Sequence, residues 1–238
     1  MISAVIFDLD NTLINFWEFK QKAVLAAAKV IYETKLLDKN LEEIYDGIFN
    51  IYYSKGADYQ YAIRDYLQIF QLSKKEHDDL LQRAVFAYKN TKENILKPYE
   101  GIIEMLDELK KSNLKLAILT DATYSQAINR IEKCNLSKYF DVICTFEHSK
   151  TYKPSKASFV KVLEELREEP KNVAMVGDNP SRDIKGAKEI GLTTFLAKWG
   201  FCYGDDGTKA DFILERPADL IKILREINFP ASIYSRLY

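Results

Sequence analysis

The chain has 238 residues, of which 47% are apolar and 13% aromatic, so it can bury the core of one large domain or of a domain that carries an insertion. Its formal net charge of −1 gives no electrostatic basis for binding nucleic acid or an anionic membrane. We find neither an apolar run of membrane-spanning length nor a signal-peptide pattern. The cysteines are scattered, which is typical of free thiols, and we expect a cytoplasmic protein with Cys134, Cys144 and Cys202 reduced.

The first predicted strand, residues 4–7, is followed by two carboxylates, Asp8 and Asp10. Open α/β sheets bind ligands at the carboxyl ends of their strands, which is where these residues are expected to lie. Two negative charges so close together in a dry site require a cation. One carboxylate could act as a nucleophile while the other transfers a proton. The alternative is a pair of acidic turn residues that cap a helix.

Residues 15–94 show helical spacing throughout and predict helices over about 18–35, 39–54, 58–71 and 74–91. The capping-box pattern from Ser73 to Glu76 marks the start of the last one. This connection is far longer than an ordinary crossover between strands, so we expect an inserted helical lid above the Asp8–Asp10 loop. For its aromatic segment, packing inside the helical unit is favoured over contact with substrate at Tyr52, Tyr53, Tyr59, Tyr61 and Arg64.

After residue 95, short apolar runs alternate with amphipathic stretches, an order that predicts a parallel sheet with helices on both faces. The expected strands are 115–119, 141–144, 173–176, 193–196 and 211–214. The expected helices are about 100–111, 124–134, 156–167 and 182–190, with a last one starting at Pro217. Gly191 is placed to end the helix that precedes the strand at 193.

Four further polar residues follow these strands and should meet Asp8 and Asp10 at one edge of the sheet. The Thr120 hydroxyl could bind an anionic oxygen, or it could cap the next helix. Lys153 could neutralise a carboxylate or a phosphate, although an isolated lysine is more often solvated. Asp178 and Asp183 could equally be a turn residue and a residue of a first helical turn. Together, these hard oxygen ligands suit Mg²⁺.

The set of motifs resembles that of the haloacid dehalogenase superfamily of hydrolases. The matching residues are Asp8-Leu9-Asp10-Asn11-Thr12, then Thr120, then Lys153-Pro154, and finally Gly177-Asp178 with Asp183. The resemblance implies a Rossmann-like α/β core, with a parallel sheet and helices on both faces, over residues 1–14 and 95–238. It also implies an inserted all-helical cap domain at 15–94, between the first two motifs.

The resemblance implies a role for each matched residue. Asp8 would be the nucleophile that forms an aspartyl-phosphate, and Asp10 the general acid and then base. Mg²⁺ would be held by Asp8, Asp178 and the Asp10 backbone carbonyl. The phosphoryl oxygens would be bound by Thr120 and Lys153, with Asp183 acting behind them on Lys153 or on metal-bound water.

Asp10 favours a phosphatase within this superfamily, because the dehalogenases lack that second aspartate. We therefore expect an Mg²⁺-dependent phosphomonoester hydrolase acting on a small phosphorylated metabolite. A 2-haloacid dehalogenase, a phosphotransferase or phosphomutase, and a non-catalytic binding protein on the same fold are the alternatives. The chain departs from the usual pattern at Asp121-Ala122, where many members have Asn or Gly, so the substrate contacts there stay open. The sequence does not decide between monomer and homodimer.

Overall fold

The computed structural model describes residues 1–55, 59–200 and 207–230. The chain divides into two compact units, one formed by Met1–Asn15 with Lys97–Tyr238 and the other by Phe16–Leu96. Two of our sequence assignments, the helix start at 58 and Cys202, lie outside the described residues. The helical segment between the first two strands is thus a unit with its own contacts.

The first unit is built on a six-stranded parallel sheet in the order β3-β2-β1-β4-β5-β6. β1 and β4 lie at the centre of the sheet and are buried along their whole length. Their continuous apolar sequences fit this position, because both faces of a parallel sheet are covered. The predicted strands are confirmed to within one residue. They are β1 (Ala4–Phe7), β2 (Lys115–Leu119), β3 (Val142–Cys144), β4 (Val173–Gly177), β5 (Thr193–Ala197) and β6 (Phe212–Leu214).

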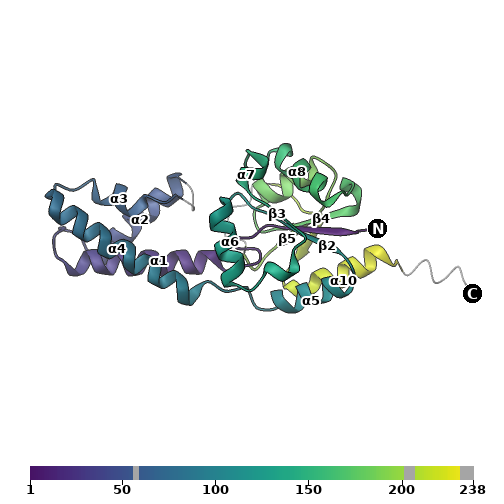
Figure 1. Cartoon of the computed structure of the whole chain (residues 1–238), viewed down its shortest axis with the longest axis horizontal. Helices are drawn as coiled ribbons and strands as arrows, with labels where there is room; N and C mark the ends of the chain where they lie inside the picture. The colour runs from purple at the N-terminus through teal and green to yellow at the C-terminus, as the bar shows by residue number, and fades with distance from the viewer. Residues whose placement is uncertain (56–58, 201–206, 231–238) are drawn as a thin grey trace, which may run out of the picture. The chain divides into compact units, whose positions relative to one another are not determined.

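Helices cover both faces of this sheet, as predicted: α5 and α10 pack together on one face, and α8 lies on the opposite face (Figure 1). The bounds are α5 (Ile102–Lys111), α6 (Tyr124–Lys133), α7 (Phe146–Ser149), α8 (Lys156–Leu166), α9 (Lys185–Lys188) and α10 (Pro217–Asn228). Short 3₁₀ turns are η1 (Ser137–Tyr139) and η2 (Pro170–Asn172), and a π turn, η3 (Pro180–Ile184), runs into α9. Gly191 has a φ of 87°, a left-handed conformation that ends the helix as expected.

The second unit contains four described helices: α1 (Phe16–Glu33), α2 (Leu41–Lys55), α3 (Ala62–Leu67) and α4 (Lys74–Ile95). The capping box at Ser73 and Glu76 is present, whereas α3 is shorter than the predicted helix. A buried apolar cluster joins all four helices, and it includes Ile31, Ile48 and Leu80. In the aromatic segment, Tyr52 is buried in this cluster and Tyr59 packs against it, while Tyr53 and Tyr61 are exposed.

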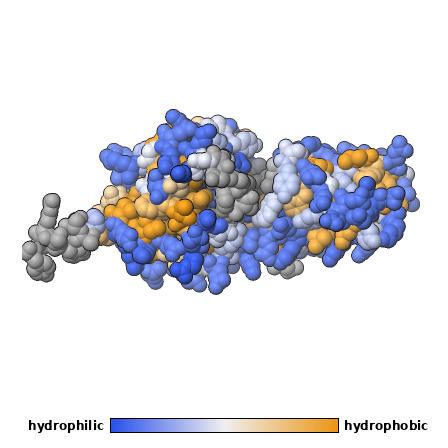
Figure 2. Space-filling view, turned by 180° about the vertical axis from the view of Figure 1, so that it is seen from behind, coloured by the Kyte–Doolittle hydropathy of each residue, from blue (hydrophilic) through white to orange (hydrophobic). Residues whose placement is uncertain are grey.

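An apolar groove of about 280 Å³ lies at the amino end of β1, on the edge of the sheet opposite the predicted site. It is lined by Met1, Leu109, Leu224 and Phe229, among others, and Figure 2 shows orange surface in this part of the first unit. No described helix has both the length and the apolar character that crossing a membrane requires.

Candidate active site

Asp8 lies at the centre of the candidate site because it directly follows β1, which pairs with both β2 and β4. A backbone hydrogen bond of 2.9 Å from Asp8 N to Val176 O continues this pairing past the end of the strand. The carboxyl is buried, and its Oδ1 accepts a hydrogen bond from Lys153 Nζ at 2.5 Å. The geometry therefore holds a carboxyl group in a fixed orientation at the carboxyl end of the sheet.

The Thr12 hydroxyl group lies between the carboxyl groups of Asp178 and Asp8. Thr12 Oγ1 lies 3.1 Å from Asp178 Oδ1 and 3.4 Å from Asp8 Oδ2. Asp178 Oδ2 is buried, and no group in the described part of the chain forms a hydrogen bond with it. Leaving a buried carboxylate oxygen unsatisfied is costly, so this atom fits a position completed by a cation. Thr12, which the sequence singled out only as part of a motif, is thereby a residue of the site.

Lys153 and Asp183 form a second buried pair behind Asp8. Lys153 Nζ lies 2.7 Å from Asp183 Oδ1 and donates a hydrogen bond of 3.2 Å to the Leu119 carbonyl. Asp183 Oδ2 accepts a hydrogen bond of 3.0 Å from Asn179 N, so its carboxylate is fixed at both ends. Asp183 does lie in the first turn of η3, and because it is only 1% exposed it also belongs to the buried cluster.

Thr120 is buried at the end of β2, and its hydroxyl accepts a 3.2 Å hydrogen bond from Ala122 N. It does not cap the following helix, because the N-cap of α6 is Thr123. The next residue, Asp121, accepts a hydrogen bond of 2.9 Å from Lys153 N and forms an ion pair with Arg182. The departure from the usual pattern at Asp121 therefore supports the loop that carries Lys153.

Asp10 lies in the turn after β1, and its side chain forms an ion pair with Arg130 of α6. Arg130 belongs to none of the four motifs and is not among the predicted site residues. The helical spacing of this segment nonetheless indicates that position 130 faces inward, because it lies on the same buried face of α6 as Ala127 and Ile131. A charged residue on such a stripe requires a buried partner.

Burial, with a smaller contribution from the charges of Asp183 and Asp10, raises the pKa of Asp8 to about 7 against the opposing effect of Lys153. Burial likewise holds the pKa of Asp178 well above its usual range, with the charge of Asp8 adding to the effect. Burial alone would lower the pKa of Lys153, but Asp183 and Asp8 raise it, so the ammonium group stays charged. Both buried carboxyls therefore favour their protonated forms unless a further positive charge stabilises the carboxylates.

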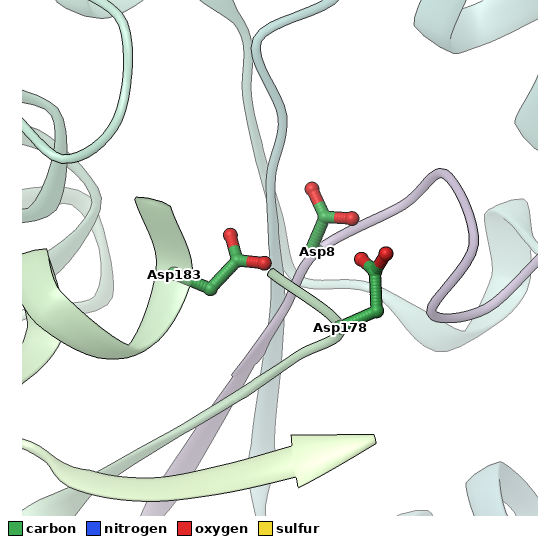
Figure 3. A group of neighbouring side chains, drawn as sticks. All are labelled: Asp8, Asp178 and Asp183. Carbon is green, nitrogen blue, oxygen red and sulfur yellow. The ribbon is translucent and has the colours of Figure 1, made fainter. Parts of the chain in front are cut away.

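Figure 3 shows the three carboxylates of this cluster, each from a different part of the chain. Asp8 follows β1, Asp178 follows β4, and Asp183 comes from the helical turn η3. One oxygen atom of each lies within 4.8 Å of the others, so the residues could hold a metal ion. Asp183 has one oxygen on Lys153 and the other on Asn179 N, whereas Asp8 Oδ2 has only a 3.4 Å contact with Thr12, so Asp8 and Asp178 are the better candidates for direct ligands.

The structure thus brings together Asp8, Thr120, Lys153, Asp178 and Asp183 around one edge, with Asp10 in the adjoining turn. The family of haloacid dehalogenase-like hydrolases matches residues 5–197, which includes all of these positions. The chain belongs to this family of hydrolases, and the resemblance inferred from its motifs is confirmed.

Named relatives match the chain over nearly its whole length. A glyceraldehyde 3-phosphate phosphatase of Methanocaldococcus jannaschii is 28% identical over 96% of this chain and 99% of its own. A phosphoglycolate phosphatase of Aquifex aeolicus is 31% identical over 92% of this chain and 95% of its own. A crystal structure of a phosphatase of the same family from Thermococcus onnurineus has a TM-score of 0.67 and 26% identity, and covers 94% of this chain and 98% of its own. The chain is a phosphatase-type enzyme of the family.

Proposed function

We propose that the protein is an Mg²⁺-dependent phosphomonoester hydrolase that acts on a small phosphorylated metabolite through an aspartyl-phosphate at Asp8. The observation that carries the proposal is the buried Asp8 carboxyl, held by Lys153 on one side and next to the unsatisfied Asp178 oxygen on the other. Phosphoryl transfer depends mainly on such positioning and on neutralising charge.

In the first step, an oxygen of the Asp8 carboxylate attacks phosphorus and the bond to the leaving oxygen breaks. The Asp10 carboxyl donates its proton to that oxygen, so the product leaves as an alcohol. Lys153 and Thr120 hold the oxygens of the transferred phosphoryl group. Asp183 keeps the Lys153 ammonium in place through their 2.7 Å ion pair.

In the second step, Asp10, now a carboxylate, takes a proton from a water molecule that attacks phosphorus. The bond between phosphorus and the Asp8 oxygen breaks, which releases inorganic phosphate and restores both carboxyl groups. The same residue therefore serves as acid and then as base, and the protons balance over one turnover.

Asp8, Asp178 and the Asp10 backbone carbonyl are the proposed ligands of Mg²⁺, a set of oxygen donors that suits this ion. Mg²⁺ supplies positive charge against the phosphoryl oxygens and lets the neighbouring carboxylates stay ionised. When all four carboxyls, Asp8, Asp10, Asp178 and Asp183, are ionised, the two cations Lys153 and Arg130 offset half of their charge, and a divalent ion would balance the rest.

A small substrate is supported by the insertion point of the helical unit, which begins at Phe16, a few residues after Asp10. We propose that residues 15–94 act as a cap that closes over the site and excludes bulk water. The named relatives act on small phosphate esters, glyceraldehyde 3-phosphate and phosphoglycolate, which fit such an enclosed site.

The decisive experiment measures phosphate release from p-nitrophenyl phosphate, from small sugar and acid phosphates, and from a folded phosphoprotein, with MgCl₂ or with EDTA. We expect Mg²⁺-dependent release that is fastest on the small esters. Asp8→Asn should abolish it while the protein stays folded, because an amide cannot form the phosphoenzyme. Half-buried Asp219 of α10, replaced by Asn, is the matched control and should keep full activity.

Each alternative predicts a different result. Chloride release from a 2-chloro acid without Mg²⁺ would support a 2-haloacid dehalogenase. Faster turnover of the phosphoprotein than of the small esters would contradict the proposal that the substrate is a small metabolite. Transfer of phosphate to a second sugar, rather than to water, would identify a phosphotransferase. A folded protein that binds but never hydrolyses esters would be a binding protein.

A further inference from the structure

Arg130 is a buried arginine in a helix that otherwise turns apolar side chains inward. The residue is 3% exposed and lies between Ala127 and Ile131 on the buried face of α6. A guanidinium group remains protonated at any pH at which the protein is folded, so burying it requires a counter-charge. Arg130 lies outside the four motifs that define the family, and the reaction as described makes no use of it.

Asp10, which is 120 residues away in the sequence, supplies a counter-charge. Arg130 Nη1 pairs with Asp10 Oδ2, and the side chains are 4% and 18% exposed. The contact joins α6 to the turn after β1, and both elements belong to the same compact unit. Because the pair is mostly shielded from water, it constrains the carboxylate far more than a surface ion pair would.

The backbone around Asp10 is fixed independently of this pair. Asn11 N donates to Ile14 O at 2.8 Å, and Trp199 Nε1 donates to Thr12 O at 2.9 Å. These hydrogen bonds place the Asp10 Cα atom but leave rotations about two side-chain bonds. Proton transfer requires a carboxyl oxygen within hydrogen-bond reach of the leaving oxygen, so those rotations must be restricted.

We propose that Arg130 is a positioning residue that sets the orientation of the Asp10 carboxyl group for proton transfer. This assignment rests on the proposed function, because it concerns the acid and base of that reaction. Arginine suits the task better than lysine, since its planar guanidinium fixes the plane of a bound carboxylate whereas an ammonium group acts as a point charge.

The test compares an alkyl phosphate, glycerol phosphate, with p-nitrophenyl phosphate, whose leaving group needs little protonation. Removing a general acid costs about 10²- to 10⁴-fold where protonation matters. For Arg130→Met we expect kcat/KM to fall at least about tenfold more on the alkyl ester than on the aryl ester. Arg130→Lys should show the same bias with a smaller loss. Arg225→Met, an exposed arginine of α10, is the matched control and should change neither rate.

A double-mutant comparison separates positioning from general structural damage. If Arg130 acts through Asp10, adding Arg130→Met to Asp10→Asn should cost little beyond the loss from Asp10→Asn alone. Equal losses on both esters in folded Arg130→Met and Arg130→Lys, or losses that multiply with Asp10→Asn, would overturn the assignment. If Arg130→Met does not fold, the ester comparison in Arg130→Lys decides.

The two proposals fail in distinguishable ways. A wild-type protein that hydrolyses neither ester would refute the proposed function, and this assignment with it. Normal wild-type hydrolysis that Asp8→Asn abolishes, combined with no leaving-group bias in the Arg130 variants, would refute the positioning role alone.

Discussion

Competition between protons and Mg²⁺ gives the most direct test of the acidic cluster. Burial raises the pKa of Asp8 to about 7 in the protein without metal, so at about pH 5 the protonated form exceeds the carboxylate about a hundredfold. Mg²⁺ binds the carboxylate and must displace that proton. Its apparent dissociation constant should therefore rise at least about tenfold, or about 1.4 kcal/mol, for each pH unit below 7.

Titration calorimetry of MgCl₂ into the EDTA-treated protein, between about pH 5 and about pH 8, measures this dependence. Repeating it in buffers with different heats of ionisation counts the protons released. We expect at least one proton per ion at the acidic end, since Asp178 also has a pKa raised by burial. Asp8→Asn should bind Mg²⁺ more weakly and with a flatter pH dependence. An apparent affinity that stays constant below pH 7 would refute the electrostatic account of the cluster.

Two further predictions concern stability. Lys153→Met removes the cation shared by two buried carboxyls, so it should lower the free energy of unfolding in urea by about 3–5 kcal/mol. The control Lys156→Met, at an exposed position, should change this free energy little. A Lys153→Met protein as stable as the wild type would contradict the buried pairing. At Gly186 a Cβ atom would lie 2.3 Å from the Phe159 ring, so Gly186→Ala should cost about 1–3 kcal/mol in thermal unfolding. Lys185→Ala, at the exposed neighbouring position, is its control, and similar losses in both variants would argue against the clash.

Much of the site could be predicted because chemistry and topology coincide in this fold. Each predicted strand ends next to a polar residue, and parallel strands place their carboxyl ends along one edge. Asp8, Asp178 and Thr120 could therefore be brought together from strand order alone. The capping pattern at Ser73 and the left-handed Gly191 are equally local, and the structure contains both.

The side-chain partners could not be predicted in the same way, because they depend on orientation between elements that lie far apart in the chain. Thr12 reaches Asp178 across 166 residues, and Arg130 reaches Asp10 across 120. Strand order places a backbone but leaves side-chain rotations undetermined. The buried stripe of α6 indicated that position 130 faces inward, yet nothing in the sequence pattern named its partner.

Asp121 shows how such a partner changes the meaning of a departure from the family pattern. Read alone, an extra carboxylate beside Thr120 would repel an anionic substrate. In the structure, one of its oxygens accepts a hydrogen bond from Lys153 N, and the other pairs with the half-exposed guanidinium of Arg182. Arg182 thereby balances the negative charge of Asp121, and the hydrogen bond from Lys153 N holds the loop that carries Lys153. A residue that looked unfavourable for phosphate binding instead supports the cation that the proposed reaction requires.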